Sequence, residues 1–322
     1  MVNVYKEIDD KLIELNYNDE HLINADSIEE KTWIHIENPS NEMLVGLSKI
    51  TSIPMTLLIS ALDEEESAHV DQEDNSFLIV LDVPFIDEND NITTKPFVIA
   101  YNDNYFITVS NYNKTLKDTI LNKVKIVEPQ KQIRMTLNFI YYLSKEFISI
   151  LKIIDNKTKS IEKELYSSLK NEELFKMLAV NKTFVYISNA LNADKGVLSK
   201  LLKSSRFMRY EQDMDLMEDA QIELEQAIEM CTIYRDISAS TMDAFSSVIG
   251  NNLNILMKRL SIITIVLSLP TLIASIWGMN FVDLPLEETP YGFYIVLGIA
   301  LIFTIVGAIF VLFVSKNKKP KK

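Results

Sequence analysis

The chain has 322 residues, of which 48% are hydrophobic and 24% charged, a mixture that favours a soluble body with a membrane segment over a polytopic membrane protein. Its net charge of −13 is uneven, because residues 258–322 carry seven Lys or Arg and three Asp or Glu, for +4, which leaves −17 on residues 1–257. So acidic a body attracts cations and repels nucleic acid, and the single cysteine, Cys231, excludes an intrachain disulfide and a thiolate zinc cluster.

Residues 1–128 have the composition of a mixed domain of strands and helices. Short segments rich in β-branched and aromatic residues predict strands at 32–36, 77–83, 96–101, 104–109 and 124–127. Polar turns are expected at 87–91 and 102–104, and residues 38–51 begin with a turn and cap signal and continue with helical spacing. The acidic start of the chain has no apolar stretch, so we expect no signal peptide there.

The stretch from residue 130 to residue 277 predicts three long helices, because it holds one proline and two glycines and consists mostly of good helix formers. We place them at about 130–168, 172–204 and 213–277. The last is about 95 Å long at 1.5 Å per residue and needs a partner along its length. In its first half an apolar line recurs at alternating steps of three and four residues, as in a coiled-coil seam: Met217, Ala220, Leu224, Ala227, Cys231 and Tyr234.

Two uncharged runs near the C-terminus are each longer than the ~20 residues that cross a bilayer, and they predict membrane spans at about 260–277 and 291–314. Lys258 and Arg259 precede the first span, and five lysines follow the second. The positive-inside rule then puts both termini in the cytoplasm and the connecting loop outside, in a multi-pass protein of the cell (inner or plasma) membrane. A role for these basic residues in gating cations electrostatically is the alternative.

These elements predict three domains. Residues 1–128 form a cytoplasmic α/β domain, residues 129–257 a cytoplasmic helical stalk, and residues 258–322 a transmembrane domain with a basic cytoplasmic tail. The predicted fold class is therefore an α+β cytoplasmic domain plus a long-helix stalk and two transmembrane helices per chain.

A second line along the last long helix is polar, and we call it the polar seam. Steps of three and four residues from Ser240 pass through Asp243, Ser247, Gly250, Asn254, Met257, Ser261, Thr264, Ser268, Thr271, Ser275 and Gly278. A coiled coil is apolar at these positions, so a polar seam predicts a line that faces water, which several copies around an axis could enclose. The alternative is that the hydroxyls bond back to their own helix or join neighbouring helices.

The chemistry of the polar seam favours a hydrated cation as cargo. Uncharged hydroxyl and amide oxygens make weak, repeated sites that an ion can leave as well as enter. Mg²⁺ keeps its waters tightly, and amide oxygens can accept hydrogen bonds from those waters. Just beyond the first span, Asp283, Glu287 and Glu288 either concentrate cations or are ordinary solvated loop acids.

The segment LPTLIASIWGMNF at 269–281 is similar to the signature of the CorA family of magnesium channels, and the resemblance extends over essentially the whole chain. It implies a homopentameric funnel, with self-association and contact with membrane lipid, in which the five first spans line a central pore. It also implies that Gly278, Met279 and Asn280 form the outer mouth, which selects and binds hydrated Mg²⁺.

The same resemblance assigns roles further along the seam. It places a pore ring of asparagine at Asn254, a hydrophobic constriction at Met257 and Leu260, a pore threonine at Thr271 and an acidic ring at Asp243. Leu260 lies one position off the polar seam. The family closes when cytoplasmic Mg²⁺ binds acids between subunits, and Asp219 aligns with one of these acids, although it could equally lie on a solvated helix face. Candidates for its partner acid lie within 63–66 or 71–74.

The sequence also departs from the family. Ser275 stands where the family often has glycine, residues 66–71 lack the basic run expected there, and 282–288 match the family's loop only loosely. These departures leave the ion preference open. The metal-binding residues predicted from the resemblance are Asn280, Asp219 and Asp243.

The predicted function is a Mg²⁺-gated Mg²⁺ channel that also passes Co²⁺ and Ni²⁺. A zinc-preferring CorA-like transporter is one alternative, disfavoured because His and Cys are few. A membrane-anchored coiled-coil sensor without transport is the other, disfavoured by the polar seam. We expect no enzymatic activity, because the scattered glycines and three separated histidines build no phosphate loop or catalytic group.

Overall fold

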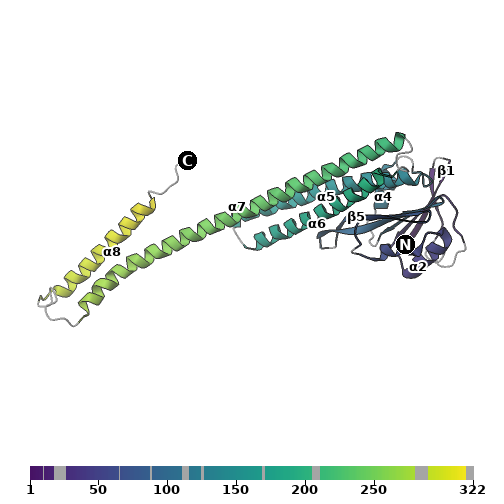
Figure 1. Cartoon of the computed structure of the whole chain (residues 1–322). Coiled ribbons are helices and arrows are strands. Elements are labelled where there is room, and N and C mark those ends of the chain that lie inside the picture. The colour runs from purple at the N-terminus through teal and green to yellow at the C-terminus, as the bar shows by residue number, and fades with distance from the viewer. Residues whose placement is uncertain are drawn as a thin grey trace. The chain divides into compact units, whose positions relative to one another are not determined.

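The structure is a computed structural model that describes residues 1–9, 11–17, 27–64, 66–87, 89–110, 116–124, 127–168, 171–204, 211–279 and 289–316. The chain forms two compact units, Met1–Met242 and Asp243–Lys322. Each unit is described by itself below, and Figure 1 labels their elements. The domain boundaries expected after residues 128 and 257 stay predictions.

The first unit is built on one seven-stranded sheet with the strand order β2-β1-β3-β7-β6-β5-β4. The strands are β1 (Val2–Ile8), β2 (Lys11–Leu15), β3 (Thr32–Glu37), β4 (His69–Glu73), β5 (Ser76–Ile86), β6 (Ile92–Tyr101) and β7 (Tyr105–Ser110). All neighbours are antiparallel except β3 and β7, which pair in parallel with Ile34 opposite Ile107. Strands β4 to β7 follow one another as a meander, and Asp74 and Asp90 take the left-handed conformation in its turns, at φ 52° and 58°.

Helices cover both faces of this sheet. Along β5, Ile79 and Leu81 face a core shared with α5 and α6, whereas Leu78 and Val80 face a core shared with the short helices α2 (Asn41–Thr51) and α3 (Met55–Leu58). A strand that is buried on both faces needs apolar residues at every position, which is why β5 reads as an almost continuous hydrophobic run. A 3₁₀ helix, η1 (Ile59–Leu62), and α4 (Leu116–Lys123) complete the two layers.

Most of the elements predicted for this unit are confirmed. The segments predicted as strands at 32–36, 77–83, 96–101 and 104–109 lie in β3, β5, β6 and β7, and residues 41–51 form α2. The strand predicted over 124–127 is wrong for Val124 and Val127, which lie in no strand, while 125–126 fall outside the described residues. Val124 instead donates its N–H to the carbonyl oxygen of Ile120 at 3.0 Å and closes the last turn of α4.

The three long helices are confirmed as α5 (Gln132–Ser168), α6 (Asn171–Leu202) and α7 (Glu211–Trp277). The apolar line predicted on α7 is buried in the first unit, with Met217, Ala220, Leu224, Ala227 and Cys231 all in the core. Cys231 donates its S–H to the carbonyl oxygen of Phe184 on α6 at 3.5 Å, and the rings of Phe184 and Tyr234 lie 6.4 Å apart. The partner that this part of α7 needs is therefore supplied by α5 and α6 of the same chain, as Figure 1 shows.

The second unit contains the end of α7 and α8 (Gly292–Lys316), which lie beside each other in Figure 1. Both helices hold stretches long and apolar enough to cross a membrane, within Asp213–Trp277 and Gly292–Phe310. They approach closely at Gly307, where an added Cβ would lie 3.1 Å from Cδ1 of Leu269. The partly covered positions Ile262, Val266, Leu269, Ile273 and Trp277 recur at steps of three and four, so the face of α7 that carries Leu269 is turned toward α8.

Candidate functional site

The polar seam is one continuous face of α7. In the single chain its side chains from Asp243 to Ser275 are all exposed: Asp243, Ser247, Asn254, Met257, Ser261, Thr264, Ser268, Thr271 and Ser275. At about 100° per residue, the membrane part of the seam lies roughly 180° around the helix from the face turned toward α8. Leu260, one position off the seam, is 59% exposed. The seam is therefore the side of this span that α8 leaves uncovered.

Four hydroxyl groups of the seam bond to carbonyl oxygens of their own helix. The donors are Ser261, Thr264 and Thr271, which bond to the residue four positions earlier at 2.9, 3.0 and 3.1 Å, and Ser268, which bonds to Ile265 at 2.8 Å. This is the bonding of the alternative raised from the sequence. It does not use up the hydroxyl oxygens, because each keeps lone pairs that can accept a hydrogen bond. With their protons directed at the backbone, these hydroxyls present acceptors to anything that lies along the seam.

The helix ends where the Gly-Met-Asn tripeptide begins. Gly278 donates its N–H to Ala274 O at 2.9 Å and Met279 donates to Ile276 O at 3.3 Å, which closes the last turn. A Cβ on Gly278 would lie 3.3 Å from that same oxygen of Ala274, so a larger residue presses on the backbone here. The C-terminus of α7 is the negative end of the helix dipole and favours a cation.

The remaining residues expected at the outer mouth lie outside the described part of the chain. These are Asn280 and the loop acids Asp283, Glu287 and Glu288. Their roles stay predictions.

The candidate regulatory acid, Asp219, is exposed on α7. Glu223, one turn further on, is instead paired with Lys145 of α5 at 3.5 Å, and the Lys145 Nζ lies 4.3 Å from the centre of the Tyr141 ring. Among the residues that the structure describes, no three His, Cys, Asp or Glu side chains lie close enough together to hold a metal ion. The described residues of one chain therefore do not surround Asp219 with the further oxygen ligands that Mg²⁺ requires.

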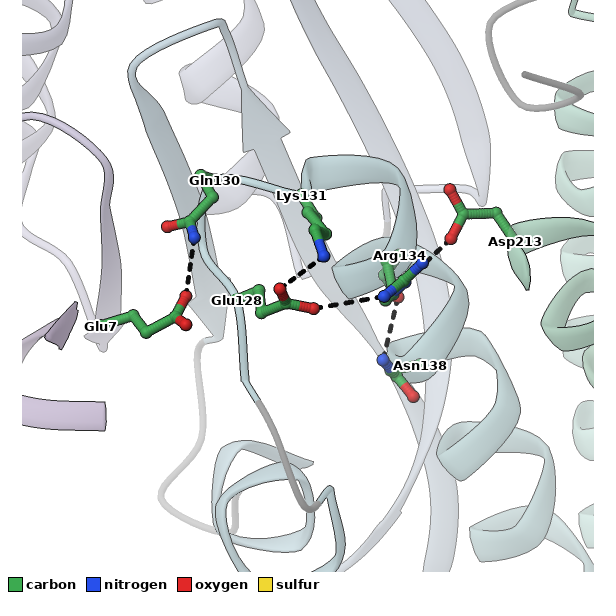
Figure 2. Close-up of polar contacts among 7 residues, drawn as sticks. All are labelled: Glu7, Glu128, Gln130, Lys131, Arg134, Asn138 and Asp213. Atoms are coloured by element: carbon green, nitrogen blue, oxygen red, sulfur yellow. Dashed lines mark hydrogen bonds and ion pairs between the residues drawn. The ribbon is translucent and has the colours of Figure 1, made fainter. Parts of the chain in front are cut away.

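A polar network that the sequence did not predict ties the first turn of α7 to the start of α5. Figure 2 shows Arg134 between two carboxylates, with its Nε 2.9 Å from Asp213 Oδ1 and its Nη1 3.2 Å from Glu128 Oε2. Lys131 also pairs with Glu128, at 2.5 Å, and the Asn138 amide donates to the Arg134 carbonyl oxygen at 3.0 Å. Burial by itself lowers the pKa of Arg134, but the hydrogen bonds and charges of Asp213 and Glu128 outweigh it and raise that pKa. The guanidinium therefore stays charged and holds two largely buried carboxylates.

Removing the guanidinium should loosen this junction. We expect Arg134→Gln to lower the free energy of unfolding by about 2 kcal/mol, because the side chains of Asp213 and Glu128, which are 8% and 15% exposed, lose their charged partner. Denaturant unfolding of the detergent-purified chain measures the change. The control is Lys131→Gln, whose lysine side chain is 48% exposed and should contribute less than about 1 kcal/mol. Equal effects of the two substitutions would show that the ion pairs of Arg134 stabilise the fold no more than the exposed pair of Lys131.

Comparison with known proteins identifies the family. A family model described as CorA-like Mg²⁺ transporter protein matches residues 29–319, across both units. This chain belongs to the CorA-like Mg²⁺ transporter family. The resemblance read from 269–281 is thus confirmed at the level of the family.

Individual CorA-like relatives match over nearly their whole length. The cobalt/magnesium transport protein CorA of Methanocaldococcus jannaschii is 27% identical over 304 residues, which cover 93% of this chain and 92% of that protein. The protein of the same name from Thermotoga maritima is 21% identical, over 89% of this chain and 83% of that one. The complete structure of the CorA magnesium transporter from Methanocaldococcus jannaschii superposes with a TM-score of 0.82 at 25% identity over 96% of both chains. The predicted combination of an α/β soluble domain, a long helix and two apolar helices is therefore confirmed.

Proposed function

We propose that this chain carries divalent cations across a membrane, as a Mg²⁺ channel that also passes Co²⁺ and Ni²⁺. The observation that carries the proposal is the polar seam on α7, a line of uncharged oxygen acceptors on the face of an apolar span turned away from α8. A lipid-facing helix has no need of such a line. The names of the two relatives, both cobalt/magnesium transport proteins, support transport over enzymatic activity.

The seam makes a pathway only when several copies surround one axis, and we take the homopentamer implied by the family resemblance as the assembly. A hydrated ion then meets the outer mouth at Gly278, Met279 and Asn280 and descends along rings of Ser275, Thr271, Ser268, Thr264 and Ser261. Met257 and Leu260 form an apolar constriction that gates by excluding water. Asn254, Ser247 and the acidic ring of Asp243 follow on the cytoplasmic side.

The orientation in the membrane follows from charge. Lys258 and Arg259 at the inner end of the first span, and the lysines after the second, place both termini in the cytoplasm of a multi-pass protein in the cell (inner or plasma) membrane. The outer mouth, with Asp283, Glu287 and Glu288, then faces outside.

Transport is tested with the purified full chain in liposomes loaded with a Mg²⁺-sensitive dye. We expect external Mg²⁺ to enter faster than into empty liposomes, and Co²⁺ and Ni²⁺ to enter as well when dyes for those ions are used. Flux of Zn²⁺ in preference to Mg²⁺ would favour the zinc-transporting alternative. No flux of any divalent cation would leave only the coiled-coil sensor.

We further propose that Mg²⁺ closes the channel by binding Asp219 together with ligands from a second copy. Asp219→Asn should then keep the channel conducting at internal Mg²⁺ concentrations that stop the unmodified protein, because the amide binds Mg²⁺ far more weakly than a carboxylate. The matched control is Glu223→Gln, one helical turn away, whose carboxylate already pairs with Lys145. Inhibition that is unchanged in Asp219→Asn would assign this residue to a solvated helix face. The measurement is the rate of dye response against internal Mg²⁺.

A further inference from the structure

A buried carboxyl group, that of Asp194, lies where α6 packs on the sheet, and it has no role in the proposed transport. Asp194 of α6 is 2% exposed, and its Oδ1 accepts the backbone N–H of Asp82 on β5 at 2.9 Å. Its other oxygen, Oδ2, is buried and has no hydrogen-bond partner in the described part of the chain. A fully buried carboxyl oxygen without a donor is costly when the group is ionised.

The backbone explains why a carboxyl group stands at this place. Asp82 is opposite Pro96 in the β5–β6 ladder, and a proline has no N–H to exchange across the pair. The N–H of Asp82 therefore points away from β6, to the side where β4 lies. However, β4 begins at His69, which is opposite Val80, so in the described chain no strand reaches Asp82 on that side. The carboxyl group of Asp194 takes the position of the missing strand partner, and in this way α6 is attached to β5.

We propose that the carboxyl group of Asp194 is a proton-binding site that makes the attachment of α6 to the sheet sensitive to pH. In the protonated form the carboxyl group carries no charge, and its carbonyl oxygen accepts the Asp82 N–H. In the ionised form a charge is left in a dry position with one hydrogen bond. The inference does not rest on the proposed transport.

The electrostatics of the site agree with its geometry. Burial raises the pKa of Asp194 well above its usual range and the charge of Asp82 raises it further, against the lowering effect of the Asp82 N–H. Burial also raises the pKa of Asp82, to about 6. Among the described residues, the charge that acts on Asp194 is that of Asp82.

Several basic side chains on the surrounding elements have partners of their own. On the strands, His69 of β4 lies 3.6 Å from Glu66, and Lys95 of β6 lies 3.2 Å from Glu64. On the helices, Lys195 of α6 lies 3.7 Å from Glu225 of α7, and Lys145 of α5 lies 3.5 Å from Glu223. Lys157 of α5 donates to the Asp90 carbonyl oxygen at 3.4 Å. None of these partners is Asp82 or Asp194.

The direction of the pH effect follows from these pKa values. Both acids bind a proton more tightly in the folded chain than in the unfolded chain, so the site stabilises the fold most in acid. For Asp82 that stabilisation is lost as the pH rises from 3.8 to about 6, and for Asp194 it is lost as the pH rises through its raised pKa. The attachment of α6 to β5 should therefore weaken as the pH rises from acidic to neutral.

The test is the melting temperature of the detergent-purified full chain between pH 5 and pH 8, followed by circular dichroism. Asp194→Asn keeps an oxygen acceptor for the Asp82 N–H but cannot ionise. Its melting temperature should therefore fall by about 2–4 °C less between pH 5 and pH 8 than that of the unmodified chain. A shift of this size corresponds to about 1 kcal/mol in a domain of this size. The readout is the slope with pH, which remains interpretable if the substitution changes stability overall. Asp236→Asn, at an exposed acid on α7, is the control and should keep the original slope.

Infrared spectroscopy gives a second readout that does not depend on stability. In the difference spectrum between pH 5 and pH 8, the unmodified chain should show the carbonyl stretch of a carboxylic acid, and Asp194→Asn should reduce it. A slope equal to that of the unmodified chain, together with an unchanged carboxylic acid band, would overturn the proposal.

Discussion

The substitution Asn280→Ala is expected to abolish Mg²⁺ entry into liposomes while the protein still assembles. A methyl group cannot accept hydrogen bonds from the waters that Mg²⁺ keeps, and no charge in the tripeptide replaces the lost oxygen. Each lost hydrogen bond to a charged group costs about 1.5–3 kcal/mol, or about 10- to 100-fold in binding. Because every copy around the axis loses the same group, we expect flux to fall by at least about 100-fold.

Flux is measured with the Mg²⁺-sensitive dye, and assembly by size-exclusion chromatography in detergent. The matched control is Asn251→Ala, which removes the same amide from an exposed position of α7 next to, and not on, the polar seam. It should leave flux within about twofold. Normal uptake by Asn280→Ala would remove the outer-mouth role and would move ion selection down to the seam.

The long elements could be predicted from the sequence because their signals are local and repeated. The end of α7 falls at Trp277 as predicted, since a run free of charge and glycine stops there. Its buried line was predicted because packing against α5 and α6 needs an apolar residue at every third or fourth position, wherever the partner helix comes from. Family membership could also be predicted, because the Gly278 to Asn280 signature stands in an ordered context of two spans.

The edge strands of the sheet were not predicted, because their signals are neither local nor repeated. Strands β2 and β4 expose charged and polar side chains, and an edge strand needs few apolar residues. Their pairing is decided by neighbours far along the chain and not by their own propensity. By contrast, β1 carried a usable signal, because Val2 and Val4 alternate with polar residues and lie on one buried face.

The pairing within the two polar clusters of the first unit had no signal in the sequence. Arg134 and Asp213 are 79 residues apart, and Asp82 and Asp194 are 112 apart, so no spacing rule connects them. Each pair exists because the fold brings two elements together at a point where the backbone or a buried carboxylate needs a partner. Asp82 inside the apolar run FLIVLDV is the one residue whose position could have prompted the question, since a charged group there needs a compensating contact.

The proposal that the polar seam faces water can be tested with introduced cysteines, because the native thiol of Cys231 does not react with thiol reagents at neutral pH. Cys231 is 1% exposed, and burial raises its pKa to about 11, so almost no reactive thiolate is present at neutral pH. The expected result is that a membrane-impermeant, positively charged thiol reagent modifies Thr271→Cys and Ser268→Cys in liposomes and blocks Mg²⁺ flux at least tenfold, because the attached cation lies in the path of the ion.

The control is Ile263→Cys in the same span, at an exposed position turned about 140° around the helix from Ser268 and about 80° from Thr271, and also away from the face toward α8. A thiol that faces lipid stays protonated and out of reach of the reagent, so this variant should be neither labelled nor blocked. Labelling at Ile263→Cys with none at Ser268→Cys or Thr271→Cys would place the hydroxyls against protein or lipid. The back-bonded hydroxyls would then only satisfy their own helix, and an ion would have to cross the membrane by another route.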